Sequence, residues 1–94
     1  MDAVIARARV VFTGRVQGVY FRAHCQENAE GLGLRGYVRN LRDGGVEAVF
    51  EGERTAIEEA VAWNTDRQPF ASVEDATVAW ETPTGEFTAF EIRH

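Results

Sequence analysis

The sequence predicts an α+β fold in which two helices cover one face of a small antiparallel sheet. Apolar residues alternate with polar ones in several short segments, as in half-buried strands, and recur at helical spacing in two others. The segments follow the order strand, helix, strand, strand, helix, strand, with a short final strand added. This βαββαβ order is that of the ferredoxin-like sandwich. A chain of 94 residues has room for one core, so we expect a single domain over residues 1–94.

The first half of the chain divides into a strand, a helix and a second strand. Residues 7–13 alternate and place three apolar side chains on one face: Ala8, Val10 and Phe12. Residues 21–32 carry apolar side chains at helical spacing, namely Phe21, Cys25, Ala29 and Leu32, and Gly31 and Gly33 help to end this helix. Residues 36–41 form the second strand, with Val38 and Asn40 on one side and Tyr37, Arg39 and Leu41 on the other.

The second half begins with a hairpin turn signal, Asp-Gly-Gly at residues 43–45. A third strand follows over residues 46–51, with inward positions at Val46, Ala48 and Phe50. Residues 55–64 form an amphipathic helix whose core face holds Ile57, Ala60, Val61 and Asn64. A fourth strand is marked by Ala76, Val78 and Trp80. After a turn at residues 83–85, a last strand holds Phe90 and Ile92.

The run from Gly14 to Arg22 joins the first strand to the first helix and has the features of an anion site. Its two glycines allow a tight turn and a close approach of the backbone to a ligand. Unpaired N–H groups at a helix start point outward, and the helix dipole adds positive potential. Arg22 lies in the first helical turn, and its guanidinium fork suits an oxyanion better than a lysine would.

The predicted topology brings Asn40 to the same edge of the sheet as this loop. The first and second strands run parallel with the third between them, so their carboxyl ends are about 10 Å apart. An arginine side chain can close that gap over a small ligand. Asn40 has the parity of Val38 and should therefore point to the helix-covered side, where Arg22 starts its helix. We expect the loop, Arg22 and Asn40 to converge.

Composition narrows the classes of partner. Fifteen acidic residues against ten arginines, with no lysine, give a net charge of −5, which disfavours nucleic acid. The lysine-free, acidic composition reflects either adaptation to high salt or the arginine bias of a GC-rich genome. No apolar run approaches a membrane span and no signal-peptide pattern is present, so we expect a cytoplasmic protein with no membrane partner. Cys25 is the only cysteine, which excludes an internal disulfide and a cysteine-based metal cluster.

Three motifs together resemble the acylphosphatase family over nearly the whole chain. They are Gly14-x-Val16-Gln17-Gly18-Val19-x-Phe21-Arg22, then Leu32-Gly33-Leu34-x-Gly36-Tyr37-Val38-Arg39-Asn40, then Asp43-Gly44-x-Val46-Glu47. The resemblance implies the fold described above and hydrolysis of a carboxyl–phosphate anhydride without metal or other cofactor. It places the phosphate-binding arginine on Arg22 and the water-positioning asparagine on Asn40. It places the backbone phosphate loop on Arg15, Val16, Gln17, Gly18, Val19 and Tyr20. We expect a monomer.

The chain departs from the usual family pattern at three places. Tyr37 stands where tryptophan is common in the family, and Gln68-Pro69 stands where a Gly-Pro pair is usual. Leu41 stands where some members carry a residue with a hydroxyl group. The first change keeps a large aromatic on the open sheet face. The second leaves the turn before the fourth strand less defined, and the third removes one possible partner of the Asn40 side chain.

Other chemistry-bearing residues have ordinary structural explanations. His24 lies two positions beyond Arg22 and should turn away from it, as a helix-surface residue. Cys25 should be small core packing, and Glu58-Glu59 and Glu27/Glu30 solvated faces rather than a metal site. Trp63, Trp80 and Phe50 should be core or half-buried packing. Arg7, Arg9, Arg39 and Arg42 are expected to be surface charges.

Two other functions share this topology, which hosts many activities. An RNA-binding module would need aromatic side chains that stack on bases, surrounded by basic residues. Tyr37 and a net chain charge of −5 give little support to an RNA- or ligand-binding module. A degenerate or accessory domain of a larger carbamoyl phosphate enzyme is disfavoured by the short chain and by the presence of Arg22 and Asn40. The sequence does not identify the physiological acyl phosphate.

Overall fold

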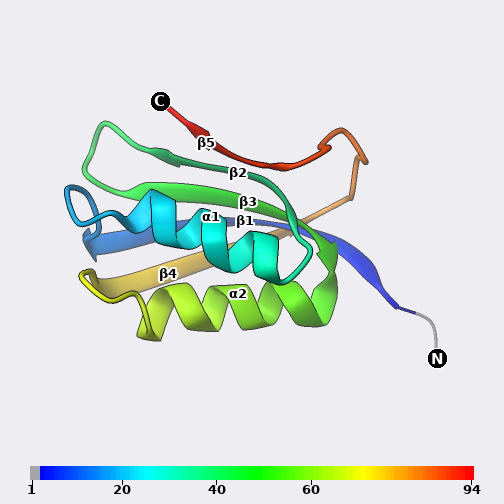
Figure 1. Cartoon of the computed structure of the whole chain (residues 1–94), viewed down its shortest axis with the longest axis horizontal. Coiled ribbons are helices and arrows are strands. Elements are labelled where there is room, and N and C mark those ends of the chain that lie inside the picture. The colour runs from blue at the N-terminus through cyan, green and yellow to red at the C-terminus, as the bar shows by residue number, and fades with distance from the viewer. Residues whose placement is uncertain (1–2) are drawn as a thin grey trace.

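A computed structural model describes residues 3–94 and contains every predicted element. The elements, in chain order, are β1 (Ile5–Arg15), α1 (Phe21–Gly31), β2 (Arg35–Asn40), β3 (Val46–Glu53), α2 (Arg54–Asp66), β4 (Ser72–Glu81) and β5 (Phe90–Arg93). Figure 1 shows both helices on the same face of the sheet, as the ferredoxin-like arrangement predicts. The strand β2 ends one residue earlier than expected, because the Leu41 N–H bonds to the Gly45 carbonyl over 2.8 Å and so closes the hairpin turn.

The sheet has five strands in the order β4-β1-β3-β2-β5. The strand pairs β1–β3, β1–β4 and β2–β3 are antiparallel, so β1 and β2 run parallel on either side of β3, as predicted. The expectation of a wholly antiparallel sheet is wrong at one edge, where β5 pairs in parallel with β2. The short connection 82–89 reverses the chain after β4, and β5 therefore enters the far edge of the sheet in the direction of β2.

The core lies between the sheet and the two helices. The alternating positions of β1 and β3 face it, and Val10, Phe12, Val46, Ala48 and Phe50 are fully buried. From α1, Phe21 packs against Phe12 with the ring centroids 5.1 Å apart. Asn64 of α2 also reaches the core and donates a hydrogen bond to the Ala60 carbonyl. The periodicities in the sequence therefore identified the buried face correctly.

The edge strand β4 is less buried than the pattern suggests. Trp80 is 40% exposed and Val78 is 37% exposed. Both lie beside α2, where Arg54 stacks over the Trp80 ring at 4.1 Å from its centroid. An edge strand has a neighbour on one side alone, so its outer side chains keep part of their surface in water.

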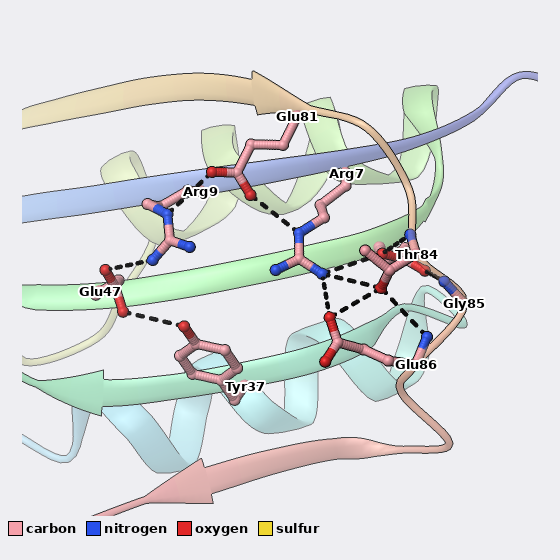
Figure 2. A network of polar contacts seen from close by, with 9 residues as sticks. Arg7, Arg9, Tyr37, Glu47, Glu81, Thr84, Gly85 and Glu86 are labelled. Carbon is pink, nitrogen blue, oxygen red and sulfur yellow. Dashed lines mark hydrogen bonds and ion pairs between the residues drawn. The ribbon is translucent and has the colours of Figure 1, made fainter.

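The other face of the sheet carries a network of ion pairs (Figure 2). Arg7 pairs with Glu81 at 3.0 Å and Glu86 at 2.8 Å. The buried Glu47 carboxylate accepts hydrogen bonds from Arg9, Arg39 and the Tyr37 hydroxyl. These three arginines were expected to be surface charges. Glu51 and Glu81 lie directly opposite Arg7, and Glu47 lies opposite Arg39, whereas Arg9 reaches Glu47 and Glu81 diagonally. All three arginines are therefore paired, although the Arg39 side chain remains 46% exposed.

The connection 82–89 crosses this same face (Figure 2). The backbone N–H groups of Thr84 and Gly85 donate to the Glu51 carboxylate over 3.1 and 2.6 Å. Phe87 packs against Tyr37, with ring centroids 6.0 Å apart. Tyr37 was expected on an open sheet face, but it is only 8% exposed because this connection covers it.

Among the residues described, neither helix combines the length and the apolar character that crossing a bilayer requires.

Candidate active site

The loop between β1 and α1 starts from a distortion of β1. The pairing of β1 with β4 shifts register between Thr13 and Gly14, and Gly14 adopts φ +116°. A Cβ at this position would lie 2.5 Å from the Ser72 carbonyl oxygen, so only glycine fits. This bulge turns the chain out of the sheet and toward the start of α1. Gly18, with φ +72°, continues the turn.

The loop presents unpaired backbone donors in front of α1. Within residues 3–94, the N–H groups of residues 17–20 donate no backbone hydrogen bond. They precede Phe21, the first residue of α1, where the helix dipole gives positive potential. Arg22 follows in the first turn. Donors, dipole and guanidinium therefore lie together, which is the arrangement expected of an anion site.

The Gln17 side chain fixes this loop to the β2–β3 hairpin. Its Nε2 donates to the Leu41 carbonyl over 2.7 Å and to the Gly45 carbonyl over 2.8 Å. The hairpin is itself closed by a bond from the Gly45 N–H to Asp43 Oδ1 over 2.9 Å. Because Leu41 follows Asn40 directly, Gln17 sets the distance between the loop and Asn40. The sequence had indicated only the backbone of Gln17, and a side chain with two N–H donors in a turn was the signal for this second role.

One cavity of about 530 Å³ brings the predicted residues together. Its lining includes Val16, Gly18 and Tyr20 of the loop, Arg22 of α1 and Asn40 of β2. Asn40 thus lies on the helix side of the sheet, as its parity with Val38 predicts. Three loop residues do not line the cavity: Arg15, Gln17 and Val19. Val19 is buried beneath the loop, and Arg15 is exposed at the end of β1.

The last strand supplies further contacts that the sequence did not reveal. Arg22 Nη1 donates to the Arg93 carbonyl over 3.1 Å and lies 3.3 Å from His94 Nδ1. Ile92 and His94 also line the cavity. A main-chain carbonyl carries no sequence signal, and this contact depends on β5 pairing with β2. The contact holds the guanidinium at one side of the cavity.

His24 and Cys25 lie outside the cavity. The His24 ring faces Phe70, with ring centroids 5.9 Å apart, rather than Arg22. Cys25 is fully buried, and burial raises the pKa of its thiol, which makes it a poor nucleophile. Within residues 3–94, no three His, Cys, Asp or Glu side chains converge as a metal site would require. Among the described residues that line the cavity, Arg22 supplies the permanent positive charge.

Comparison with known proteins identifies the family. The acylphosphatase family model matches residues 8–92. An acylphosphatase of Roseiflexus sp. (strain RS-1) is 52% identical over 88 residues, covering 94% of this chain and 95% of that protein. One from Pelotomaculum thermopropionicum is 48% identical over 87 residues, covering 93% and 95%. The crystal structure of acylphosphatase from Bacillus subtilis superposes with a TM-score of 0.90 at 33% identity, covering 97% of this chain and all (100%) of that one. The chain therefore belongs to the acylphosphatase family.

Proposed function

We propose that the phosphoryl group of the substrate binds to the 15–20 loop and Arg22, and that Asn40 positions the attacking water. As an acylphosphatase, the protein hydrolyses the carboxyl–phosphate bond of acyl phosphates to a carboxylate and phosphate. The observation that supports these roles is the single cavity lined by the loop, Arg22 and Asn40. Its size suits a small phosphorylated carboxylate.

The chemistry of an acyl phosphate explains why so few groups are required. The leaving group is a carboxylate with a pKa near 4, which departs without protonation, so no general acid is needed. The transition state is loose and spreads negative charge over three equatorial oxygens. Backbone N–H groups and the Arg22 fork stabilise this charge from fixed positions. Catalysis then consists of positioning and electrostatic stabilisation.

Asn40 acts on the water by geometry rather than as a base. Its amide oxygen accepts a hydrogen bond from the water and its N–H₂ donates to a phosphoryl oxygen, but an amide does not take up a proton at neutral pH. The phosphoryl group of the substrate accepts the proton of the water. Gln17 keeps Asn40 and the loop at a fixed separation through Leu41, and so maintains the alignment of water and phosphorus.

A phosphate-release assay with benzoyl phosphate, in the presence of a chelator, tests this mechanism. We expect the wild-type chain to be fully active with chelator. Removing one fixed donor costs on the order of 10²–10³ in rate, so the Arg22→Ala variant should lose nearly all turnover while remaining folded. Near-normal turnover by folded Arg22→Ala would falsify the assignment of the phosphate site.

We also propose that the protein acts as a cytoplasmic monomer without a nucleic-acid partner. The net charge of −5 and the unpaired, buried thiol of Cys25 support this proposal. Light scattering should give the mass of one chain, and gel-shift titration with RNA should give no complex. The mass of a dimer would contradict the proposed monomer, and a saturable RNA complex would contradict the proposed lack of a nucleic-acid partner.

A further inference from the structure

We propose that Tyr20 and Phe70 form the binding surface for the acyl group, and that this surface selects aromatic acyl phosphates over acetyl phosphate. The proposal rests on the phosphate site proposed above. It adds where the acyl group, which leaves as a carboxylate, binds next to that site. It concerns substrate choice, which neither the family motifs nor the cavity volume determines.

In-line displacement fixes the direction of the acyl group. The attacking and leaving oxygens lie on opposite sides of the phosphorus. With the water at Asn40, on β2, the leaving carboxylate must point away from β2. The sheet order β4-β1-β3-β2-β5 places the loop after β1 between Asn40 and the chain that enters β4. The acyl group therefore points toward the start of β4.

Phe70 lies at that place. It comes two residues before Ser72, the first residue of β4, and Ser72 pairs with Arg15 at the start of the loop. Its ring contacts Tyr20 edge to face, with centroids 6.3 Å apart. Tyr20 lines the cavity. Phe70 thus lies next to the cavity-lining Tyr20, on the β4 side of the loop.

Exposure sets these rings apart from the other aromatic side chains. Tyr20 is 73% exposed and Phe70 is 61% exposed, although they touch each other. Tyr20 is the only non-glycine residue at positive φ within residues 3–94, with φ 60°. Left-handed backbone is costly for an aromatic residue and is typical of functional sites. This backbone keeps the Tyr20 ring at the mouth of the cavity instead of in the core.

The surface suits a flat apolar ligand. Stacking or edge-to-face contact between aromatic rings adds to the gain from burying apolar area. A benzoyl group can reach both rings, whereas the methyl group of acetyl phosphate covers little of either. The His24 ring of α1 lies beside Phe70, with the ring centroids 5.9 Å apart.

The test compares kcat/KM for benzoyl phosphate and acetyl phosphate within each variant. We expect Phe70→Ala to lower the benzoyl-to-acetyl ratio by roughly three- to tenfold, the size of one aromatic pair. Phe70→Tyr should keep the wild-type ratio, because the ring remains. Trp80→Ala is the matched control, since it removes another partly exposed aromatic, 40% exposed, that does not line the cavity. Inhibition by inorganic phosphate should be the same in all four proteins.

Two results would overturn the proposal. One is an unchanged ratio in Phe70→Ala. The other is an equal loss for both substrates with weaker phosphate inhibition, which would mean that Phe70 supports the loop rather than the acyl group. The ratio is independent of the Arg22→Ala result. If Arg22→Ala stayed active, the phosphate site would fail as proposed, while the ratio would still report whether the acyl group contacts Phe70.

Discussion

The side-chain amide of Gln17 donates to the main-chain carbonyl of Leu41 over 2.7 Å, and so joins the β1–α1 loop to the end of the strand that carries Asn40. The same amide bonds to the Gly45 carbonyl over 2.8 Å. One side chain thus connects the two halves of the cavity. Gln17 is a positioning residue, because its side chain faces the hairpin and does not line the cavity.

Gln17→Ala should lower kcat more than it raises KM, by roughly tenfold in kcat/KM, because water and phosphorus lose alignment. Gln26→Ala is a matched control, since it removes one glutamine bond to the Phe90 carbonyl outside the loop. Gln17→Ala should lose more thermal stability than Gln26→Ala, because Gln17 makes two such bonds and Gln26 makes one. Equal kinetic effects in the two variants would contradict the positioning role.

Arg22→Lys should also be a poor enzyme, although it keeps the positive charge. An ammonium group cannot make the two parallel bonds of the guanidinium fork, and it would lose the defined contact with the Arg93 carbonyl. Asn40→Ala should lose on the order of 10²–10³ in kcat. Single-turnover kinetics with benzoyl phosphate would measure both. Activity of Arg22→Lys within a few-fold of wild type would show that charge alone is sufficient.

Deletion of residues 93–94 should weaken binding of inorganic phosphate by roughly tenfold. Arg22 would lose its acceptor at the Arg93 carbonyl, and hydrogen bonds to charged groups contribute about 1.5–3 kcal/mol. His94→Ala is the control, because it keeps that carbonyl and removes only the imidazole. Calorimetric titration with phosphate measures both. Wild-type affinity in the deletion variant would show that Arg22 needs no support from β5.

The ion pairs on the sheet face opposite the helices should make the free energy of unfolding fall at acidic pH. Desolvation raises the pKa of Glu47, but hydrogen bonds from Arg39 and Arg9 outweigh it, and the net shift is downward. The pKa values of Glu81 and Glu86 are lowered chiefly by hydrogen bonds from Arg7. A carboxyl group whose pKa is lower in the folded than in the unfolded protein stabilises the fold at pH values above its unfolded-state pKa, which is about 4.3 for glutamate. This stabilisation is lost as the pH falls through the folded-state pKa.

Glu47→Gln should therefore lower the free energy of unfolding by about 1–3 kcal/mol at neutral pH. The difference from wild type should narrow as the pH falls below about 4. Glu59→Gln, on the exposed side of α2, is the matched control and should change little. Thermal melts across a pH series measure this. Parallel curves for wild type and Glu47→Gln would contradict the linkage.

The lysine-free, acidic composition predicts a dependence on salt. If it reflects salt adaptation, the melting temperature and the turnover should rise along a potassium chloride series, because counterions screen repulsion among fifteen acidic residues. If it reflects genome bias, both should be high in dilute buffer and stay nearly constant. Thermal melts and phosphate release at each salt concentration distinguish the two explanations.

Most of the fold followed from the sequence because its signals are local. Alternation and helical spacing located the strands and helices, and the parity of Asn40 with Val38 placed it on the helix side. The parallel pairing of β5 with β2 was missed, because the direction of an edge strand depends on how a loop crosses the sheet. The paired state of Arg7 and Arg9 was missed for a similar reason, since it depends on cross-strand register.

Local sequence patterns were enough to establish the order of the elements, the glycine loop, the place of Arg22 in the first helical turn and that of Asn40 at the end of the second strand. These features depend on backbone geometry and periodicity over a few residues. Three contacts became visible only in the folded chain: Gln17 with the Leu41 carbonyl, Arg22 with the Arg93 carbonyl, and Phe70 with Tyr20. Those contacts join residues far apart in the chain, and two of them use main-chain oxygens that every residue carries. These contacts could therefore be identified only once the strand order and register of the folded chain were known.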